Sequence, residues 1–240
     1  MANTTQDKTS LFFEEVAGED WLEGQSRLSD PLLRSTFGYA GVLSSAVETG
    51  IELNPSVGNF WRAHSSVCLS KTDVYASPAA WPFANGELDL VVLHHMLDFA
   101  RDPHSVFRDS ARIVKPGGHL MVIGFNPFSL QGARRFVNQW RGDAWHYDAI
   151  RVNRLRDWCS LLGFVECGLR YGRVIPWKAP TEKLAHLNFG LKRGLPWGSY
   201  YVMLAKKVNY SGIRRSAHKR GFELSLSGVT GKAAMRENNS

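Results

Sequence analysis

The sequence predicts an α/β fold in which a mostly parallel sheet carries helices on both faces. Two apolar runs of strand length, residues 88–93 and 119–125, flank a helical pattern that opens at Asp102-Pro103. A strand that is apolar on both faces is typical of a sheet buried between two helix layers. A strand–helix–strand connection is right-handed and makes its two strands parallel neighbours, so the segment predicts a βαβ unit.

The helix of this unit has clear start and stop signals. Asp102 can cap its first turn, and Pro103 fits the first helical position. Its inner face is predicted from Val106, Phe107, Ala111, Ile113 and Val114. The run Lys115-Pro116-Gly117-Gly118 should end it, because glycine adopts the left-handed cap and proline cannot continue a helix.

Weaker patterns surround this unit. Residues 20–37 show helical spacing interrupted at Pro31, which predicts one broken helix or two short ones. A helix over 150–162, stopped by Gly163, precedes strands over 164–170 and 199–208. The proline-containing segment between these strands is too long for a tight hairpin, and we interpret it as a lid or substrate loop.

Composition points to one domain in a reducing compartment. A chain of 240 residues with 44% hydrophobic content can bury one core. We expect a flexible leader over 1–19, a domain over 20–208 and a basic, disordered tail over 209–240. Three cysteines have neither a disulfide-framework count nor zinc-site spacing, and no window is long enough to span a bilayer. These observations favour a cytoplasmic protein without a metal site.

Positive charge is concentrated near the end of the chain. From Lys206 onward there are eight Lys and Arg residues but two Glu residues, out of a net charge of +7. Such a tail could contact RNA or another phosphate-rich partner, although a solvated basic extension is the favoured interpretation. The oligomeric state cannot be deduced from the sequence.

Residues 81–92, His95, Leu97, Asp102-Pro103 and residues 112–118 together resemble the type-11 domain of class I S-adenosylmethionine-dependent methyltransferases. The YafS-like bacterial branch is more similar still, through Phe37-Gly38-Tyr39, residues 124–129 and Pro176-Trp177. The resemblance implies a Rossmann-like sheet of seven strands, mostly parallel with an antiparallel last strand. It also implies S-adenosylmethionine as cofactor, bound beyond the carboxyl ends of the central strands.

The family binds this cofactor with a glycine-rich turn and an acid at the end of the second strand. We align the turn with residues 41–47, where Gly41 remains, serines replace other glycines, and Ser45 could bind the cofactor carboxylate. No acid stands at 60–67, where spacing puts the second strand. Glu52 resembles the family's acid but follows the first strand too soon for an intervening helix, so an ordinary surface acid is the alternative.

The third cofactor element, an acid that reaches the adenine amine, aligns with Ser77, next to Pro78. A hydroxyl can accept this hydrogen bond more weakly than a carboxylate.

His94 and His95 end the predicted fourth strand, where the transferred methyl group should lie. An imidazole there is a candidate general base that Asp98 could orient, and His94 should also face the cofactor. The alternative is that His95 is a buried structural histidine. After the fifth strand, Asn126 is a candidate for positioning the acceptor or, equally, for capping a helix.

The leading hypothesis is therefore a methyltransferase for an unidentified acceptor, expected to be a small molecule or a carrier-bound acid. The alternative is a non-catalytic methyltransferase-like protein with a degenerate cofactor site, which contacts RNA or a protein through its tail. Methylation of structured RNA is a third hypothesis.

Overall fold

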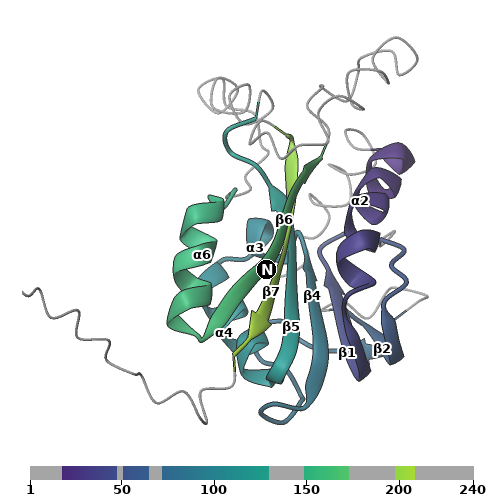
Figure 1. The fold of residues 1–240 in the computed structure, drawn as a ribbon, viewed down its shortest axis with the longest axis vertical. Helices are drawn as coiled ribbons and strands as arrows, with labels where there is room; N and C mark the ends of the chain where they lie inside the picture. The colour runs from purple at the N-terminus through teal and green to yellow at the C-terminus, as the bar shows by residue number, and fades with distance from the viewer. Residues whose placement is uncertain (1–17, 48–50, 65–71, 130–148, 173–197, 209–240) are drawn as a thin grey trace, which may run out of the picture. The chain divides into compact units, whose positions relative to one another are not determined.

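A computed structural model describes residues 18–47, 51–64, 72–129, 149–172 and 198–208 (Figure 1). They form one sheet with the strand order β3-β2-β1-β4-β5-β7-β6. The strands are β1 (Phe37–Ser45), β2 (Ser56–His64), β3 (Val74–Tyr75), β4 (Leu88–His94), β5 (Val114–Phe125), β6 (Phe164–Gly172) and β7 (Tyr200–Lys207). The helices are α2 (Gly18–Leu33), α3 (Met96–Phe99), α4 (Pro103–Ile113) and α6 (Val152–Leu161).

The direction of the strands confirms the predicted fold class. Strands β3, β2, β1, β4 and β5 pair with their neighbours in parallel, and β7 runs antiparallel to both β5 and β6. The last strand of the chain is thus inserted between two others in the opposite direction. The sheet is Rossmann-like, with seven strands and helices on both faces.

The central βαβ unit folds as predicted, with one difference at its turn. All seven residues of β4 are buried, and the Asp102 side chain caps α4 by accepting from the amides of His104 and Ser105. Gly117 has a φ of 84°, the left-handed conformation that glycine adopts at no steric cost. However, β5 already begins at Val114, so residues 115–118 form an irregular start of the strand.

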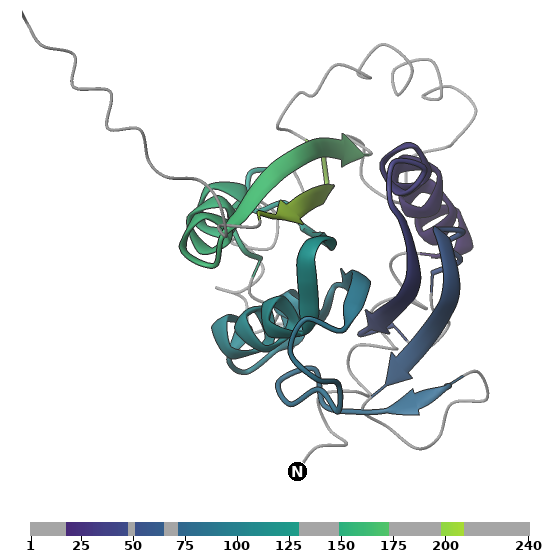
Figure 2. The same ribbon diagram turned by 60° about the horizontal axis from the view of Figure 1, so that its bottom comes forward.

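Each face of the sheet has its own apolar core. Helix α2 lies on one side of the sheet, and α4 and α6 lie on the other (Figure 2). On the α2 side the core contains Leu33, Leu43, Leu90, Val92, Met121 and Val202. On the opposite side it contains Phe107, Val91, Leu93, Val122, Leu155 and Met203. Alternate residues of each strand therefore serve opposite cores, as expected for a sheet between two layers.

Helix α2 corrects the expectation of a break at Pro31, because one continuous helix spans Gly18–Leu33 with Pro31 inside it. Pro31 lies in the last turn, so its missing amide interrupts the hydrogen bonds only close to the helix end. The next two residues, Leu32 and Leu33, are 9% and 0% exposed against the sheet. Their packing stabilises the turn that contains the proline.

The connection from β1 to β2 differs from the central unit. Its described residues 51–55 are not helical, and Ile51 and Leu53 are buried in the core on the α2 side. They lie close to α2, because the Ser26 hydroxyl donates to the backbone oxygen of Glu52 at 2.5 Å.

Three predicted segments fall outside the described residues: the leader up to residue 17, the loop over 173–197 and the tail over 209–240. The predicted domain boundaries therefore stay predictions. None of the helices in the described part of the chain is long and apolar enough to span a membrane.

Candidate functional site

The carboxyl ends of β1 and β4 lie side by side, and each ends in a polar residue. Ser45 is the last residue of β1 and pairs in register with His94, the last residue of β4. Strand β2 lies next to β1 on one side of this pair, and β5 lies next to β4 on the other side. The strand order therefore reverses between β1 and β4. Ligands of open α/β sheets bind at such a switch point, beyond the carboxyl ends of the strands.

A chain of side-chain hydrogen bonds connects this position to α2. The Ser45 hydroxyl lies 2.8 Å from Nδ1 of His94, and Nε2 of His94 lies 2.8 Å from Oε1 of Gln25. Gln25 Nε2 is 2.9 Å from Nε2 of His95, whose Nδ1 is 2.8 Å from Oδ2 of Asp98. We call these five residues the Gln25 network. All are buried, and His94, His95 and Gln25 are completely inaccessible to solvent.

Aromatic rings cover the network on the α2 side. The Trp21 ring stacks on His95 at a centroid distance of 5.8 Å and on Phe125 at 5.4 Å. Tyr200 meets the edge of Trp21 at 5.6 Å. Trp21 and Gln25 lie one helical turn apart on α2, so a single helix face supplies both the aromatic cover and the central amide.

Burial keeps both histidines neutral near pH 7. It lowers the pKa of His95 from its usual 6.5 to about 3. Burial also lowers the pKa of His94 well below 6.5, and the neighbouring His95 adds to this shift. The contact between His95 and Asp98 is therefore a hydrogen bond from a neutral ring to a carboxylate rather than an ion pair.

His95 has an unusual backbone. With a φ of 55°, it is the one non-glycine residue at positive φ in the described part of the chain. It precedes the short helix α3, and its amide donates to the Ile123 oxygen at 2.8 Å. Such a conformation in a bulky residue persists only where surrounding contacts hold it, and it is frequent at functional sites.

The structure corrects the position of the predicted glycine-rich turn. Residues 41–45 belong to β1, so the turn starts only after Ser45. Gly41 pairs with Phe60 and Leu90 inside the sheet, and an added Cβ would lie 3.0 Å from the Phe60 ring and 3.1 Å from the Leu90 oxygen. Close packing within the sheet accounts for this glycine.

Strand β2 spans Ser56–His64, earlier in the chain than the expected 60–67, and its described carboxyl end carries no acid. Glu52 is exposed and precedes β2, which starts at Ser56 opposite Phe37, the first residue of β1. Glu52 therefore lies on the return path between the strands and not at the carboxyl end of β2. This placement favours the interpretation of Glu52 as an ordinary surface acid over a role in binding the cofactor.

Ser77 and Pro78 follow directly on β3, at the same edge of the sheet as Ser45 and His94. Ser77 is exposed and Pro78 is buried in a tight turn, in which Ser77 bridges to Ala80. β3 is three positions from β4, which amounts to roughly 14 Å at about 4.8 Å per strand. At this separation Ser77 and the Gln25 network would meet only through an elongated ligand.

Asn126 follows β5 and is 3% exposed. Its Nδ2 donates to the Gly198 oxygen at 2.8 Å, and its Oδ1 accepts from the Phe128 amide at 3.1 Å. These bonds join the end of β5 to the residues before β7. They favour a structural role over direct positioning of an acceptor.

The sequence analysis missed Gln25 and Trp21. Gln25 follows Trp21 by one helical turn and precedes Ser29, which is also buried, by another. Polar residues at buried helical positions are the signal that could have found the network. Its partners could not have been named, because Gln25 is 69 residues from His94.

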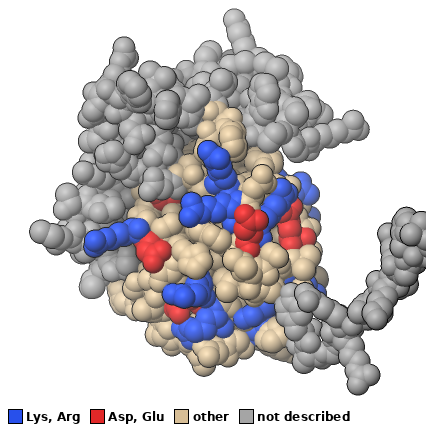
Figure 3. All heavy atoms as spheres, turned by 90° about the vertical axis from the view of Figure 1, so that its left-hand side faces the viewer, with Lys and Arg blue, Asp and Glu red and all other residues tan. Residues whose placement is uncertain are grey.

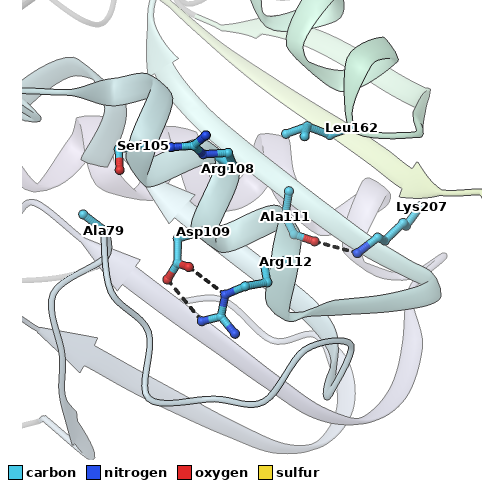
Figure 4. A pocket seen from close by; sticks show the side chains of 8 residues that line it. All are labelled: Ala79, Ser105, Arg108, Asp109, Ala111, Arg112, Leu162 and Lys207. Atoms are coloured by element: carbon cyan, nitrogen blue, oxygen red, sulfur yellow. Dashed lines mark hydrogen bonds and ion pairs between the residues drawn. The ribbon is translucent and has the colours of Figure 1, made fainter.

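A surface groove of about 450 Å³ lies elsewhere, beside α4 (Figure 4). Its most prominent cation, Arg112, is already bound to Asp109, the Phe83 and Trp81 oxygens and Asn85. Lys207 donates to the Ala111 and Val114 oxygens at the end of α4. These groups stabilise the fold, so the groove is a weaker candidate than the end of β4.

Charges of both signs occupy the face that carries α4 and α6 (Figure 3). Arg156 pairs with Glu166 at 2.6 Å and Arg112 pairs with Asp109 at 2.7 Å. These ion pairs neutralise part of the positive charge on this face of the described residues.

Comparisons with known proteins agree with the fold. Residues 37–122, from the start of β1 into β5, match the family model of a methyltransferase domain. The protein YafS of Escherichia coli (strain K12) is 34% identical over 116 residues, and the match covers 48% of this chain and 48% of YafS. The chain thus spans about half the length of this relative.

Two further similarities concern a second relative and a solved structure. A ubiquinone biosynthesis O-methyltransferase of Pseudomonas paraeruginosa is 27% identical over 159 residues, which cover 54% of this chain and 68% of that protein. The crystal structure of an S-adenosylmethionine-dependent methyltransferase from Thermotoga maritima has a TM-score of 0.61 at 17% identity, with 84% of this chain and 99% of that chain covered. The structural likeness establishes the shared fold.

Proposed function

Since residues 37–122 match the family model of a methyltransferase domain, we propose that the protein transfers a methyl group from S-adenosylmethionine to a small-molecule acceptor in the cytoplasm. One observation carries the proposal. The family match runs from β1 into β5 and includes β4, and the carboxyl ends of β1 and β4 bring Ser45 and His94 together at the switch point. A ligand at that position would be held between polar side chains and the aromatic cover of α2.

The residues at this edge suit a cationic ligand in one respect. When bound, the cofactor supplies an electrophilic methyl group on a positively charged sulfur. Because His94 and His95 are held neutral, they would not repel that charge. We assign the cofactor to the edge lined by Ser45, His94, Ser77 and Pro78, with Ser77 toward its adenine end.

The role of the protein is then mainly to bind and orient the two reactants and exclude water, which can supply most of the acceleration in such a transfer. His94 and His95 remain the candidates for accepting a proton. Both are completely buried under α2, so an acceptor reaches them only when α2 shifts.

We further propose that the acceptor is a hydroxyl group. Support comes from the ubiquinone biosynthesis O-methyltransferase of Pseudomonas paraeruginosa, which is 27% identical to this chain over 159 residues. A hydroxyl group keeps its proton near pH 7 and needs a base to accept it during the transfer, which fits histidine lone pairs at this edge.

The first test is cofactor binding, measured by calorimetry and by the melting temperature. We expect millimolar S-adenosylmethionine to raise the melting temperature, because a ligand that binds the native state stabilises it. The demethylated product should do the same. An unchanged melting temperature with both ligands, and no heat of binding, would contradict the proposal.

A substitution sharpens this test. Ser77→Asp should tighten cofactor binding, since a carboxylate accepts from the adenine amine more strongly than a hydroxyl does. Ala79→Asp is the matched control, because it adds the same charge to an exposed residue of the same turn. Equal affinities in the two variants would remove Ser77 from the site.

A second function, a non-catalytic binding protein with the methyltransferase fold, is favoured by the Gln25 network itself. The candidate histidines are buried and hydrogen-bonded within the protein, and β2 ends without an acid. This function predicts that neither S-adenosylmethionine nor its demethylated product binds, although the protein is fully folded.

A further inference from the structure

The orientation of the hydrogen bonds in the Gln25 network follows from one fixed end. The Asp98 carboxylate is the acceptor for Nδ1 of His95 and for the Phe125 amide. Nδ1 of His95 must therefore carry a hydrogen. A neutral imidazole has only one N–H group, so Nε2 of His95 carries the lone pair.

This assignment propagates through Gln25. The lone pair on Nε2 of His95 requires a donor, which is the Gln25 amide nitrogen at 2.9 Å. The Gln25 oxygen then faces Nε2 of His94 at 2.8 Å, so that nitrogen must carry a hydrogen. Nδ1 of His94 is left with a lone pair, so the Ser45 hydroxyl at 2.8 Å donates its single hydrogen there and not to the Val47 oxygen, which lies 3.0 Å away.

We propose that Gln25 is a positioning residue that holds the adjacent His94 and His95 in opposite tautomers and turns a lone pair of His94 toward the end of β1. A side-chain amide suits this task, because it offers one donor and one acceptor to two imidazole nitrogens at once.

The consequence for function rests on the proposed methyl transfer. Nδ1 of His94 presents an acceptor at the switch point, where Ser45 now donates to it. A hydroxyl of a bound molecule can take the place of the Ser45 hydroxyl at this lone pair. In the opposite tautomer His94 would present an N–H group there and could not accept that proton.

The experiment measures the tautomers in the protein without ligand, by nitrogen-15 NMR of the histidine side chains. We expect His94 to be protonated on Nε2 and His95 on Nδ1 in the unmodified chain. In Gln25→Met the amide that bonds both Nε2 atoms is gone, so the His94 signals should move toward a mixture of tautomers. Ser29→Ala is the control, because Ser29 is a buried residue of the same helix that bonds the Gln25 backbone oxygen; it should keep the original pattern.

The conservative variant Gln25→Glu covers the case in which Gln25→Met does not fold. A protonated carboxyl offers one donor and one acceptor like the amide, whereas a carboxylate offers acceptors alone. The original tautomers should thus appear at low pH and be lost when the proton leaves. The proposal is overturned if the two histidines have the same tautomer in the unmodified chain. It is also overturned if the tautomers are unchanged in folded Gln25→Met, or unchanged at all pH values in Gln25→Glu.

Cofactor titration separates this proposal from the proposed function. If Gln25 positions His94 for a bound cofactor, Gln25→Met should weaken S-adenosylmethionine binding about tenfold, the equivalent of one buried hydrogen bond. If the unmodified chain has the expected tautomers but binds no cofactor, methyl transfer fails while the positioning role stands. If it binds the cofactor but lacks those tautomers, the positioning role fails alone.

Discussion

The β1–β2 and β4–β5 connections join parallel strands in different ways. Between β4 and β5 the chain forms α4, which covers the sheet, and all seven residues of β4 are buried. Between β1 and β2 the described residues 51–55 form no helix, and the amino half of β1 leaves Phe37 and Tyr39 exposed at 73% and 83%. The difference teaches that a strand is buried by the helices packed on it, and not by its apolar content alone.

The carboxyl halves of both strands are nevertheless buried. Residues 41–45 of β1 are as inaccessible as β4, because α2 packs over this end of the sheet. The candidate site thus lies at the carboxyl ends of β1 and β4, where the two regions are equally buried. Its cover comes from a helix that precedes both strands in the chain.

The largest expected effect concerns the core of the β4–β5 region. Phe107 of α4 is completely buried, so Phe107→Ala should lower the free energy of unfolding by about 3–5 kcal/mol. Phe60→Ala in β2, where the ring is half-buried, should cost about 1–2 kcal/mol. Urea unfolding of both variants measures this contrast, and equal losses would show that the two regions are packed alike.

The second prediction concerns pH at the boundary between the regions. His95 has a pKa of about 3 in the folded chain and about 6.5 when unfolded, so the unfolded state takes up the proton first as pH falls. The neutral His95 ring therefore favours the folded state fully above pH 6.5, and this contribution to the free energy of unfolding is lost progressively as the pH falls toward 3. His94 behaves in the same direction.

We expect each histidine to lower the free energy of unfolding by about 1.4 kcal/mol per pH unit in this window. Unfolding curves between pH 7 and pH 5 measure the slope. His95→Gln should reduce it, and His104→Gln, which removes an exposed histidine, is the control. A stability independent of pH would show that the two imidazoles are not held neutral.

The third prediction tests a contact that joins the two regions. The Asp89 carboxylate on β4 accepts from the Tyr39 amide of β1 at 2.9 Å and the Ala40 amide at 3.2 Å, and it pairs with Lys115. Burial raises the pKa of the Asp89 carboxyl, but the bonds from Lys115 and the two amides lower it by a larger amount. The net effect is a lowered pKa.

Asp89→Asn should therefore cost about 1–3 kcal/mol at pH 7, because buried amides lose a charged acceptor. The wild-type advantage should persist above pH 4 and disappear as pH falls through the lowered pKa. Glu87→Gln, at an exposed residue next to β4, provides the comparison. A loss that is the same at pH 7 and pH 3 would contradict the assigned charge.

The smallest effect is expected on the uncovered half of β1. Tyr39→Ser changes an exposed side chain, so the free energy of unfolding should change by about 0.5 kcal/mol or less. A loss above about 2 kcal/mol in thermal or urea unfolding would mean that Tyr39 is covered in solution.

The sequence alone was sufficient for the β4–α4–β5 unit and its Asp102 cap, because these features depend on neighbouring residues. It also located His94 at the end of a buried strand. It did not reveal the non-helical path of the described residues 51–55 before β2, the end of β1 at Ser45 or the intact turn around Pro31. Only the tertiary structure brought Gln25 between two imidazoles about 70 residues away. Such partners are decided by how a helix packs across a sheet, and no local pattern of polar and apolar residues contains that information.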